Sequence, residues 1–299
     1  MTGVALEPDQ APTPLSRDLI ALTKPRIISL LLVTTVAPMY AAGSPTWLSV
    51  LLVTIGGYLM AGGANAVNMY LDRDIDNIMA RTRLRPIPSG RMSPIQVLAF
   101  GVACATFATW MLAHFVNVLT AGLALAGFYF YVFIYTRWLK RSSPQNIVIG
   151  GAAGAVPPLV GWAAVTGTLD VSALCLFLIV FYWTPPHFWA LALYRREEYA
   201  KAGVPMLPVT HGEKFTRLNL LLYTIILVAC SLLPFAAKLS GLIYLVAALA
   251  LGAGFMFYAI KIYREYSDAL ARRTFRYSIV YLTALFAALL VDHYLRITL

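Results

Sequence analysis

The chain has 299 residues, of which 60% are hydrophobic and only 12% are charged, and its mean hydropathy is +0.74. A soluble domain carries about 25% charged residues, and a soluble fold of this length has no core large enough to hide so much apolar surface. The composition therefore excludes an ordinary soluble protein and indicates an integral membrane protein. Cys104, Cys175 and Cys230 lie in apolar runs without a CxxC pair, which excludes a disulfide scaffold or a zinc ribbon.

The chain begins with a polar segment and continues with apolar runs of helix length. Residues 1–16 contain Glu7, Asp9 and three prolines, and we expect a disordered cytoplasmic tail there rather than a signal peptide. We expect residues 17–299 to form a single transmembrane domain. A membrane-spanning helix needs roughly 20 mostly apolar residues, and nine such runs predict an all-α bundle around a central cavity. Their approximate ranges are 27–46, 47–69, 94–113, 118–136, 147–166, 172–194, 218–237, 241–260 and 277–295.

The positions of the basic residues predict the orientation of this bundle. With the N-terminus inside, 21 of the 23 lysines and arginines fall on the inner side, and only Lys238 and Arg296 fall outside. Cytoplasmic loops are rich in basic residues in this way. We therefore expect a cytoplasmic N-terminus, an outer C-terminus and a location in the cell (inner) membrane. Because orientation explains most of the net charge of +10, no nucleic-acid partner is needed.

Two long inner connections, roughly residues 70–93 and 195–217, indicate a weak internal repeat. Each begins with charged residues and later carries two prolines, Pro86 and Pro88 in the first and Pro205 and Pro208 in the second. The pattern predicts two equivalent halves followed by one additional helix. Their ranges are 27–136, 147–260 and 277–295.

The first polar motif lies at the inner end of the second apolar run. Asn68, Asp72 and Asp76 are spaced four residues apart, which places them on one face of a helix. Two carboxylates one turn apart repel each other unless a positive charge lies between them, and Asp and Asn oxygens suit Mg²⁺, which completes its shell with water and phosphate oxygens. The row therefore indicates a magnesium-bridged diphosphate. The alternative is that these acids only pair with arginines on a solvated loop.

The residues that follow this row are basic. Arg81 and Arg85 come next, and guanidinium groups bind phosphate oxygens in a fork. Pro86, Pro88 and Gly90 end any helix and let the loop fold back over the site. We expect the acids to hold the metal and the arginines to hold the diphosphate.

The second polar motif lies in the sixth apolar run, where Pro185 and Pro186 precede His187. Two prolines inside a helix predict a kink near His187, and an imidazole beside a kink and aromatic rings is expected to face a cavity. There it would ligate a haem iron, orient a polar substituent or accept a proton. The alternative is a hydrogen-bonded core histidine. The aromatic neighbours are Tyr182, Trp183 and Trp189.

Glu197 and Glu198 follow at the depth expected for Asp76. Two interpretations stay open. The two glutamates complete a second magnesium site, or they form a salt bridge in the loop with Arg195 or Arg196.

Other conspicuous side chains carry less weight. His114 and His293 lie near the outer ends of their helices and are expected at the membrane interface, whereas the role of His211, on the inner side, stays open. The aromatic run 128–131 is interpreted as packing.

These residues resemble the UbiA superfamily of membrane prenyltransferases, from Thr23–Arg26 into the ninth apolar run. Asn68, Asp72 and Asp76 match the first motif of that superfamily. Members acting on quinone precursors carry a second Asp-rich motif, which is absent here, and this departure is typical of the branch that acts on haem. The residues that resemble the haem branch are Met79, Arg81, Thr82, Arg85–Pro86, Pro88–Gly90, Leu139–Arg141, Gln145–Gly151, Pro157–Pro158, Trp183, Pro185–Trp189 and Gly203–Pro208.

The resemblance implies a UbiA-type bundle and a reaction in which haem B, farnesyl diphosphate and water give haem O and diphosphate. It implies Mg²⁺ as the cofactor, held by Asn68, Asp72 and Asp76. The implied partners are both substrates, the lipid bilayer and, downstream, haem A synthase. The implied diphosphate-binding residues are Lys24, Arg81, Arg85 and Lys140, and the implied haem or cavity residues are Asn146, Tyr182, Trp183, His187 and Trp189.

Two other functions stay open from the sequence. The first is the same fold with another acceptor, such as an aromatic acid or a chlorophyll precursor. The second is a transporter of an anionic solute whose acids bind a coupling ion. Clustering of the candidate groups at the inner face argues against transport, because alternating access favours a site near the midplane.

Overall fold

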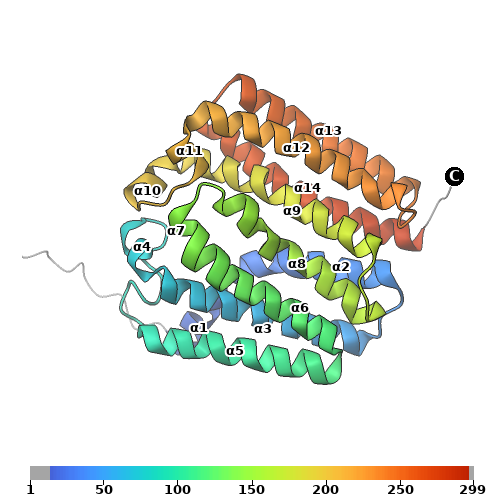
Figure 1. Ribbon diagram of the computed structural model, residues 1–299, viewed down its shortest axis with the longest axis horizontal. Helices are drawn as coiled ribbons and strands as arrows, with labels where there is room; N and C mark the ends of the chain where they lie inside the picture. Colours follow the sequence, from blue (N-terminus) through green and yellow to red (C-terminus); the bar gives the residue numbers. More distant parts are fainter. Residues whose placement is uncertain (1–13, 296–299) are drawn as a thin grey trace, which may run out of the picture.

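The computed structural model describes residues 14–295, which are largely helical and contain no β-strand. Within that range nine helical spans are long and apolar enough to cross a membrane, and they run side by side (Figure 1). The all-α membrane bundle expected from the sequence is confirmed. The spans are α2 (Pro25–Ala42), α3 (Trp47–Leu71), α5 (Pro94–Phe115), the joined segments α6 (Val118–Tyr129), η1 (Phe130–Leu139) and α7 (Lys140–Ser142), α8 (Asn146–Thr166), α9 (Val171–Tyr194), α12 (Gly212–Ala236), α13 (Leu242–Arg264) and α14 (Asp268–Tyr294).

The spans differ from the expected ranges mainly at their ends. The first ends at Ala42 rather than at residue 46, because Thr46 caps the next helix by accepting a hydrogen bond from the Ser49 amide at 3.2 Å. The ninth begins at Asp268 rather than at 277, and Ser267 caps it in the same way. The first span is thus shorter and the ninth longer than its apolar run suggested, since helix ends are set by caps and tertiary packing as well as by hydropathy.

The fourth span changes from an α-helix to a π-helix at Phe130. A π-helix has a wider turn, so the residues that follow are rotated relative to a regular helix. The ring of Tyr135 on this segment packs against Gly150 of α8, where an added Cβ would lie 2.3 Å from the ring Cδ2. The close approach of α8 to the π-helix therefore requires a glycine at position 150.

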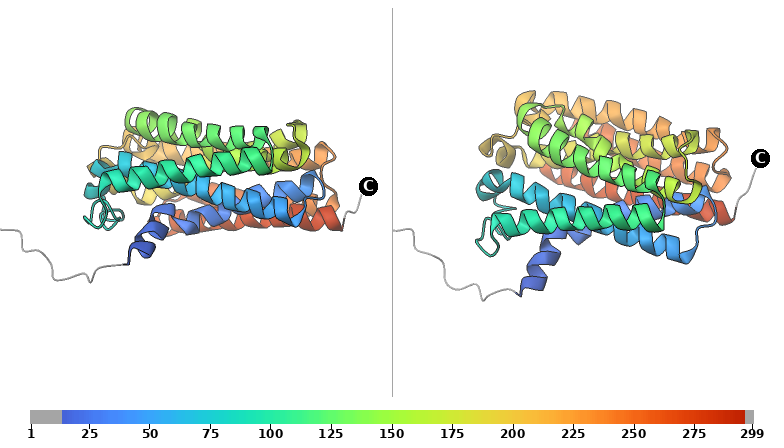
Figure 2. Two further views of the ribbon diagram at one scale, coloured as in Figure 1. Left: turned by 90° about the horizontal axis from the view of Figure 1, so that it is seen from below. Right: turned by 60° about the horizontal axis from the view of Figure 1, so that its bottom comes forward.

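Five short helices gather at one end of the bundle, which we call the polar end (Figure 1). α1 projects from the bundle at an angle (Figure 2). It begins within the last two residues of the tail expected at 1–16, whose first thirteen residues lie outside the described range. The short helices are α1 (Leu15–Thr23), α4 (Arg73–Ile78), α7, α10 (Arg196–Lys201) and α11 (Leu207–Thr210).

The two long connections pack against each other at the polar end. Ile75 and Met79 of the first connection form one buried cluster with Tyr199, Val204 and Met206 of the second. Apolar side chains in two otherwise polar loops are buried by this contact, which fixes the loops relative to each other. The internal repeat itself stays a prediction.

The opposite end is stabilised by a buried carboxylate. Asp292 of α14 is 1% exposed, and its oxygens accept hydrogen bonds from the backbone amides of Gly241 at 2.5 Å and Tyr244 at 3.1 Å. These amides lie at the start of α13 and have no partner within that helix. Asp292 therefore caps α13 from another helix and joins the last two spans.

Candidate active site

Asn68, Asp72 and Asp76 lie together at the polar end, where α3 is followed by α4. All three are buried, and Asp72 is 0% exposed. Backbone hydrogen bonds continue through the junction, from the Asp72 amide to the Asn68 carbonyl at 2.9 Å and from the Asp76 amide to the Asp72 carbonyl at 2.8 Å. Asn68 Nδ2 also donates to Asp72 Oδ2 at 2.7 Å. The geometry agrees with the expected row on one helical face.

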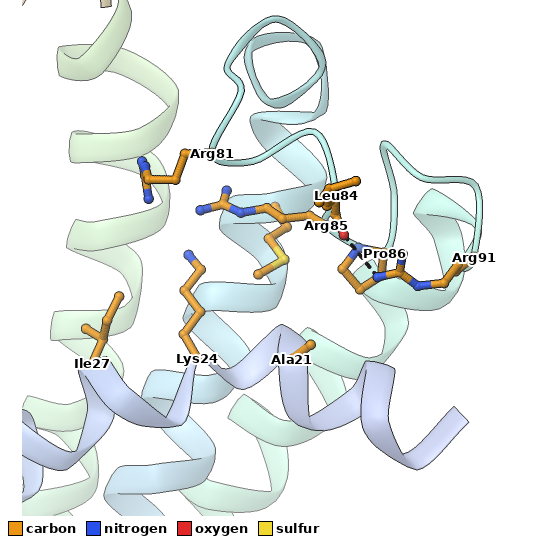
Figure 3. A pocket seen from close by; sticks show the side chains of 9 residues that line it. Ala21, Lys24, Ile27, Arg81, Leu84, Arg85, Pro86 and Arg91 are labelled. Carbon is orange, nitrogen blue, oxygen red and sulfur yellow. Dashed lines mark hydrogen bonds between the residues drawn. The ribbon is translucent and has the colours of Figure 1, made fainter. Parts of the chain in front are cut away.

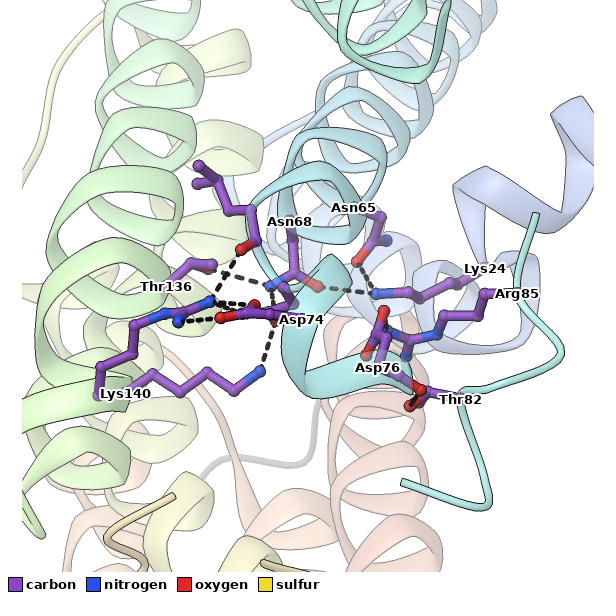
Figure 4. A network of polar contacts seen from close by, with 12 residues as sticks. Lys24, Asn65, Asn68, Asp74, Asp76, Thr82, Arg85, Thr136 and Lys140 are labelled. Atoms are coloured by element: carbon purple, nitrogen blue, oxygen red, sulfur yellow. Dashed lines mark hydrogen bonds and ion pairs between the residues drawn. The ribbon is translucent and has the colours of Figure 1, made fainter. Parts of the chain in front are cut away.

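Each acid of the row has a cationic partner (Figure 4). Lys140 Nζ lies 2.5 Å from Asp72 Oδ2. Arg85 Nη1 donates to both oxygens of Asp76, at 2.9 and 2.7 Å. These cations offset the repulsion expected between the two acids. Asp72 and Asp76 are about one helical turn apart, and each carboxylate lies closer to its cation than that spacing.

Lys24 approaches the row from the junction of α1 and α2. Its Nζ donates to the side-chain oxygens of Asn65 and Asn68, both at 3.2 Å. Burial, followed by the nearby charges of Arg85 and Lys140, lowers the pKa of Lys24 well below its usual value. Its backbone φ is 56°, a left-handed conformation that is uncommon outside glycine. This conformation is that of the residue that caps the end of α1, and it places Lys24 between α1 and α2.

A pocket with a volume of about 320 Å³ opens beside the row (Figure 3). The side-chain ends of Lys24, Arg81 and Arg85 point toward one another there. The lining includes four cations and no acid, so the pocket favours an anion. Its lining residues are Ala21, Lys24, Ile27, Met69, Arg81, Leu84, Arg85, Pro86 and Arg91.

The loop after α4 folds back over the acids, as its prolines and glycine suggested. Thr82 Oγ1 donates to the Asp76 carbonyl oxygen at 3.1 Å. Arg91 Nε donates to Asp18 of α1 at 2.9 Å, and Arg91 Nη2 donates to the Leu84 carbonyl at 3.0 Å. These contacts fix the loop that carries Arg81 and Arg85 to both α1 and α4.

The donor set fits a hard divalent cation. Asp72 Oδ1 is buried and accepts no hydrogen bond from the described residues; its nearest cation is Arg141, with Nη2 at 3.7 Å, so the oxygen retains lone pairs for a ligand. Residues 14–295 contain no group of three His, Cys, Asp or Glu side chains that could hold a metal. A site here would rely on two carboxylates and one amide, which suits Mg²⁺ because it retains water and phosphate ligands.

The second acidic pair is placed differently. Glu198 forms an ion pair with Arg195, which is the loop salt bridge that the sequence left open, and Glu197 is exposed. A second magnesium site on these residues stays a prediction.

His187 lies in an aromatic enclosure between α9 and α14. Its ring stacks on Trp183, with centroids 4.2 Å apart, and on Phe275 of α14, with centroids 4.6 Å apart. The histidine is 8% exposed. α9 continues as one helix through Pro185 and Pro186, so the kink expected there stays a prediction.

The other aromatic residues of α9 point elsewhere. Trp189 and Tyr182 lie against Tyr223 of α12, with ring centroids 5.1 and 6.2 Å away. The 3.6-residue period explains the division, because positions 183 and 187 share one face and positions 182 and 189 share another. Of the three aromatic residues expected near His187, the structure thus brings Trp183 alone to its ring.

Asn146 is fully buried at the start of α8. Its Nδ2 contacts the Pro205 carbonyl at 3.5 Å, and its Oδ1 is buried and accepts no hydrogen bond from residues 14–295. His211 is exposed and contacts Thr210, so it joins neither His187 nor the acid row.

Three further residues complete this network, of which Asn65 and Thr136 were not singled out in the sequence and Arg141 was noted only within the matching segment Leu139–Arg141. Asn65 accepts from Lys24, Thr136 Oγ1 accepts from Asn68 Nδ2 at 3.2 Å, and Arg141 pairs with Asp74 at 2.7 Å. The only available signal was the four-residue spacing of Thr136 and Lys140, and the π-helix that orients them has no recognisable sequence pattern.

A family model for the UbiA prenyltransferase family matches residues 30–289. The chain belongs to the UbiA prenyltransferase family. This prenyltransferase is 55% identical over 279 residues to a protein named protoheme IX farnesyltransferase from Burkholderia mallei (strain SAVP1), covering 93% of both chains. It is 53% identical over 289 residues to another of that name from Marinobacter nauticus, covering 96% of both. The protein is therefore a membrane-embedded transferase of prenyl groups.

Solved structures share the fold of this prenyltransferase. A chain described in work on digeranylgeranylglyceryl phosphate synthase aligns with a TM-score of 0.77 and 19% identity, covering 93% of this chain and 98% of the other. A UbiA homologue from Archaeoglobus fulgidus bound to DMAPP and Mg²⁺ aligns with a TM-score of 0.66 and 15% identity, covering 91% and 99%. At these identities the likeness extends to the fold alone.

Proposed function

We propose that this prenyltransferase transfers the farnesyl group of farnesyl diphosphate to a vinyl group of haem B and, with water, forms haem O and diphosphate. The observation that carries the proposal is the match, at 53–55% identity over more than nine tenths of both chains, to proteins named protoheme IX farnesyltransferase. The acid row and the separate aromatic enclosure around His187 also support it, because they suit two chemically different substrates.

The basic pocket would receive the diphosphate. Lys24, Arg81 and Arg85 line it, and Lys140 lies on the other side of Asp72. Ionisation of farnesyl diphosphate breaks its allylic C–O bond and leaves the electron pair on the diphosphate. Positive charges fixed beside that oxygen stabilise the leaving group more than the intact substrate, which lowers the barrier.

Asn68, Asp72 and Asp76 would hold the Mg²⁺ that members of this fold bind with a prenyl diphosphate. When bound, the ion would neutralise charge on the leaving diphosphate. Arg85, which pairs with Asp76, lines the anion pocket, and Lys140 pairs with Asp72 in the same row. We therefore propose that Lys140 and Arg85 serve both the carboxylates and the diphosphate.

The aromatic enclosure would act on the acceptor side. The electron-rich vinyl group attacks the farnesyl cation, a carbon–carbon bond forms, and the positive charge moves to the carbon next to the porphyrin. Water adds there and loses a proton, which gives the hydroxyl of the hydroxyethylfarnesyl group. Faces of aromatic rings such as Trp183 stabilise a nearby cation, and the buried, apolar surroundings of His187 would exclude water until the new bond exists.

We also propose that the polar end faces the cytoplasm of a cell whose inner membrane holds the protein. The proposal is supported by the concentration of lysines and arginines in the connections at this end, because cytoplasmic loops of membrane proteins are rich in these residues. Haem O would pass to an enzyme that oxidises it, and contact with haem A synthase is a prediction of the same proposal.

The test is mass spectrometry of haem extracted after the purified protein has been incubated with haem B and farnesyl diphosphate, with and without Mg²⁺. We expect a Mg²⁺-dependent gain of one farnesyl group and one hydroxyl group. A parallel reaction with 4-hydroxybenzoate tests the aromatic-acceptor alternative, and product from that acceptor alone would refute the proposal. Proteoliposomes that move an anion without releasing diphosphate would favour transport instead.

A further inference from the structure

We propose that His187 binds the iron of the haem substrate through Nε2, and that Ser278 of α14 fixes the ring tautomer that makes Nε2 available. The inference rests on the proposed function, because haem is the acceptor there. It assigns a ligand to the iron and gives a positioning role to Ser278, on the helix that follows the two predicted halves.

The hydrogen bonds of Ser278 determine the tautomer. Its Oγ lies 2.7 Å from the carbonyl oxygen of Phe275 and 2.7 Å from His187 Nδ1. A serine hydroxyl has one proton, and a carbonyl oxygen only accepts. Both contacts are hydrogen bonds only if the hydroxyl donates to Phe275 and His187 Nδ1–H donates to the hydroxyl. The neutral ring then carries its lone pair on Nε2.

The ring is also fixed in orientation. Trp183 and Phe275 stack on its two faces, with interplanar angles of 19° and 27°. Trp183 is held in turn, because its Nε1 donates to the backbone carbonyl of Ser278 at 2.7 Å. Ser278 therefore restrains His187 directly and restrains the ring that covers it.

Nε2 remains available for a ligand. Nε2 forms no hydrogen bond with the described residues. If it were also fully buried it would belong to their buried polar atoms without a partner, and it does not. The small exposed part of the side chain therefore includes this nitrogen. Neutral imidazole is a common axial ligand of haem iron. A metal-binding histidine usually donates its other N–H to a fixed acceptor, which sets the tautomer and raises the basicity of the ligand. Ser278 Oγ is such an acceptor.

The depth of His187 suits an acceptor held near the diphosphate. It lies about two helical turns before Tyr194, the last residue of α9, or roughly 10 Å from that end of the helix. The acid row lies at the corresponding end of α3. His187 therefore lies about two helical turns deeper in the bundle than the end at which the acid row stands.

The test is resonance Raman spectroscopy of the reduced haem complex of the full chain, together with haem titration and product analysis. We expect the wild type to show an iron–histidine stretching band. His187→Ala should lose the band, and free imidazole should restore a band from iron–imidazole. Ser278→Ala should keep the ligand but shift the band, because the hydrogen bond from Nδ1 is lost.

Ser231→Ala is the matched control. Ser231 is a fully buried helix serine that also bonds a carbonyl within its helix, and its other contact is Tyr281 rather than His187. This variant should leave the band in place. A band that persists in His187→Ala, or a wild type that farnesylates haem without showing the band, overturns the iron ligand. An unshifted band in Ser278→Ala overturns the role of Ser278. If the wild type neither binds nor farnesylates haem, the proposed function fails as well.

Discussion

Lys140 and Asp72, which are 68 positions apart in the sequence, form a 2.5 Å ion pair at the polar end. The Asp72 side chain is 1% exposed and the Lys140 side chain is 16% exposed. Removing one member of a buried pair leaves an uncompensated charge and costs about 3–5 kcal/mol. Lys140 therefore stabilises the apoprotein, and it also borders the place proposed for the diphosphate.

Asp72→Asn should lower farnesyl transfer by at least about 100-fold, comparable with the loss of a strong transition-state contact. The amide keeps the size of the side chain and an acceptor for Lys140, but it removes the charge that would hold the metal. Product formation by mass spectrometry measures the effect. Asp74→Asn is the control, because Asp74 is 60% exposed and pairs with Arg141. Near-normal transfer by Asp72→Asn would contradict the assignment.

Arg85→Lys should raise the KM for farnesyl diphosphate about 10-fold, which corresponds to about 1.4 kcal/mol. A lysine keeps the charge but lacks the planar guanidinium that contacts both oxygens of Asp76 and binds phosphate in a fork. Steady-state kinetics at saturating haem gives the value. Arg83→Lys, an exposed position on the same loop, should behave like the wild type, and equal effects at both positions would show that only net charge matters.

Chelation of divalent ions should stop transfer without unfolding the protein. The acids already have Lys140 and Arg85 as counter-charges in this structure, so the fold does not depend on a metal to offset their repulsion. Thermal unfolding in detergent, measured with EDTA and with Mg²⁺ but without substrate, should give similar midpoints. A large fall in the midpoint with EDTA would mean that the metal is structural.

Asp292→Ala should lower stability by about 2 kcal/mol, the upper end of the range for loss of a helix cap. It leaves two backbone amides of α13 without an acceptor at the end of the bundle opposite to the acid row. The kcat/KM of the remaining folded protein should stay unchanged. Asp292→Asn retains an acceptor oxygen and should lose less. An activity loss larger than the loss of folded protein would contradict a purely structural role.

The orientation predicts the behaviour of fusion proteins. A periplasmic reporter such as alkaline phosphatase should be active when fused after α14 and inactive when inserted in the loop after α4. Green fluorescent protein should show the reverse pattern. The physical reason is the concentration of lysines and arginines at the polar end. Activity of alkaline phosphatase in the loop after α4 would reverse the assigned orientation.

Much of the fold and part of the site could be predicted from local sequence. Uncharged runs of about 20 residues identify membrane helices because the bilayer excludes unpaired backbone groups. The spacing of Asn68, Asp72 and Asp76 gave their shared face because a helix repeats every 3.6 residues. The basic loop after them also followed from local residues, as did the Trp183 ring beside His187.

The pairings across the bundle did not follow from the sequence. The sequence offered pairing of the acids with loop arginines only as an alternative. The folded chain joins Arg85 of that loop to Asp76 and supplies Lys140 to Asp72 from the far end of the fourth span. Tyr182 and Trp189 were grouped with His187, yet they face α12. Ser278 had no visible role until α14 was found against α9.

The sequence alone determined that the chain is a multi-helix membrane protein with a row of oxygen ligands beside a basic loop, because hydropathy and helical period depend only on nearby residues. Only the tertiary structure decided which cation meets which acid, that a π-helix aims Thr136 and Lys140 at α3, and which nitrogen of His187 is left free. These depend on contacts between residues far apart in the chain, and their energies are set by packing and burial in the assembled bundle.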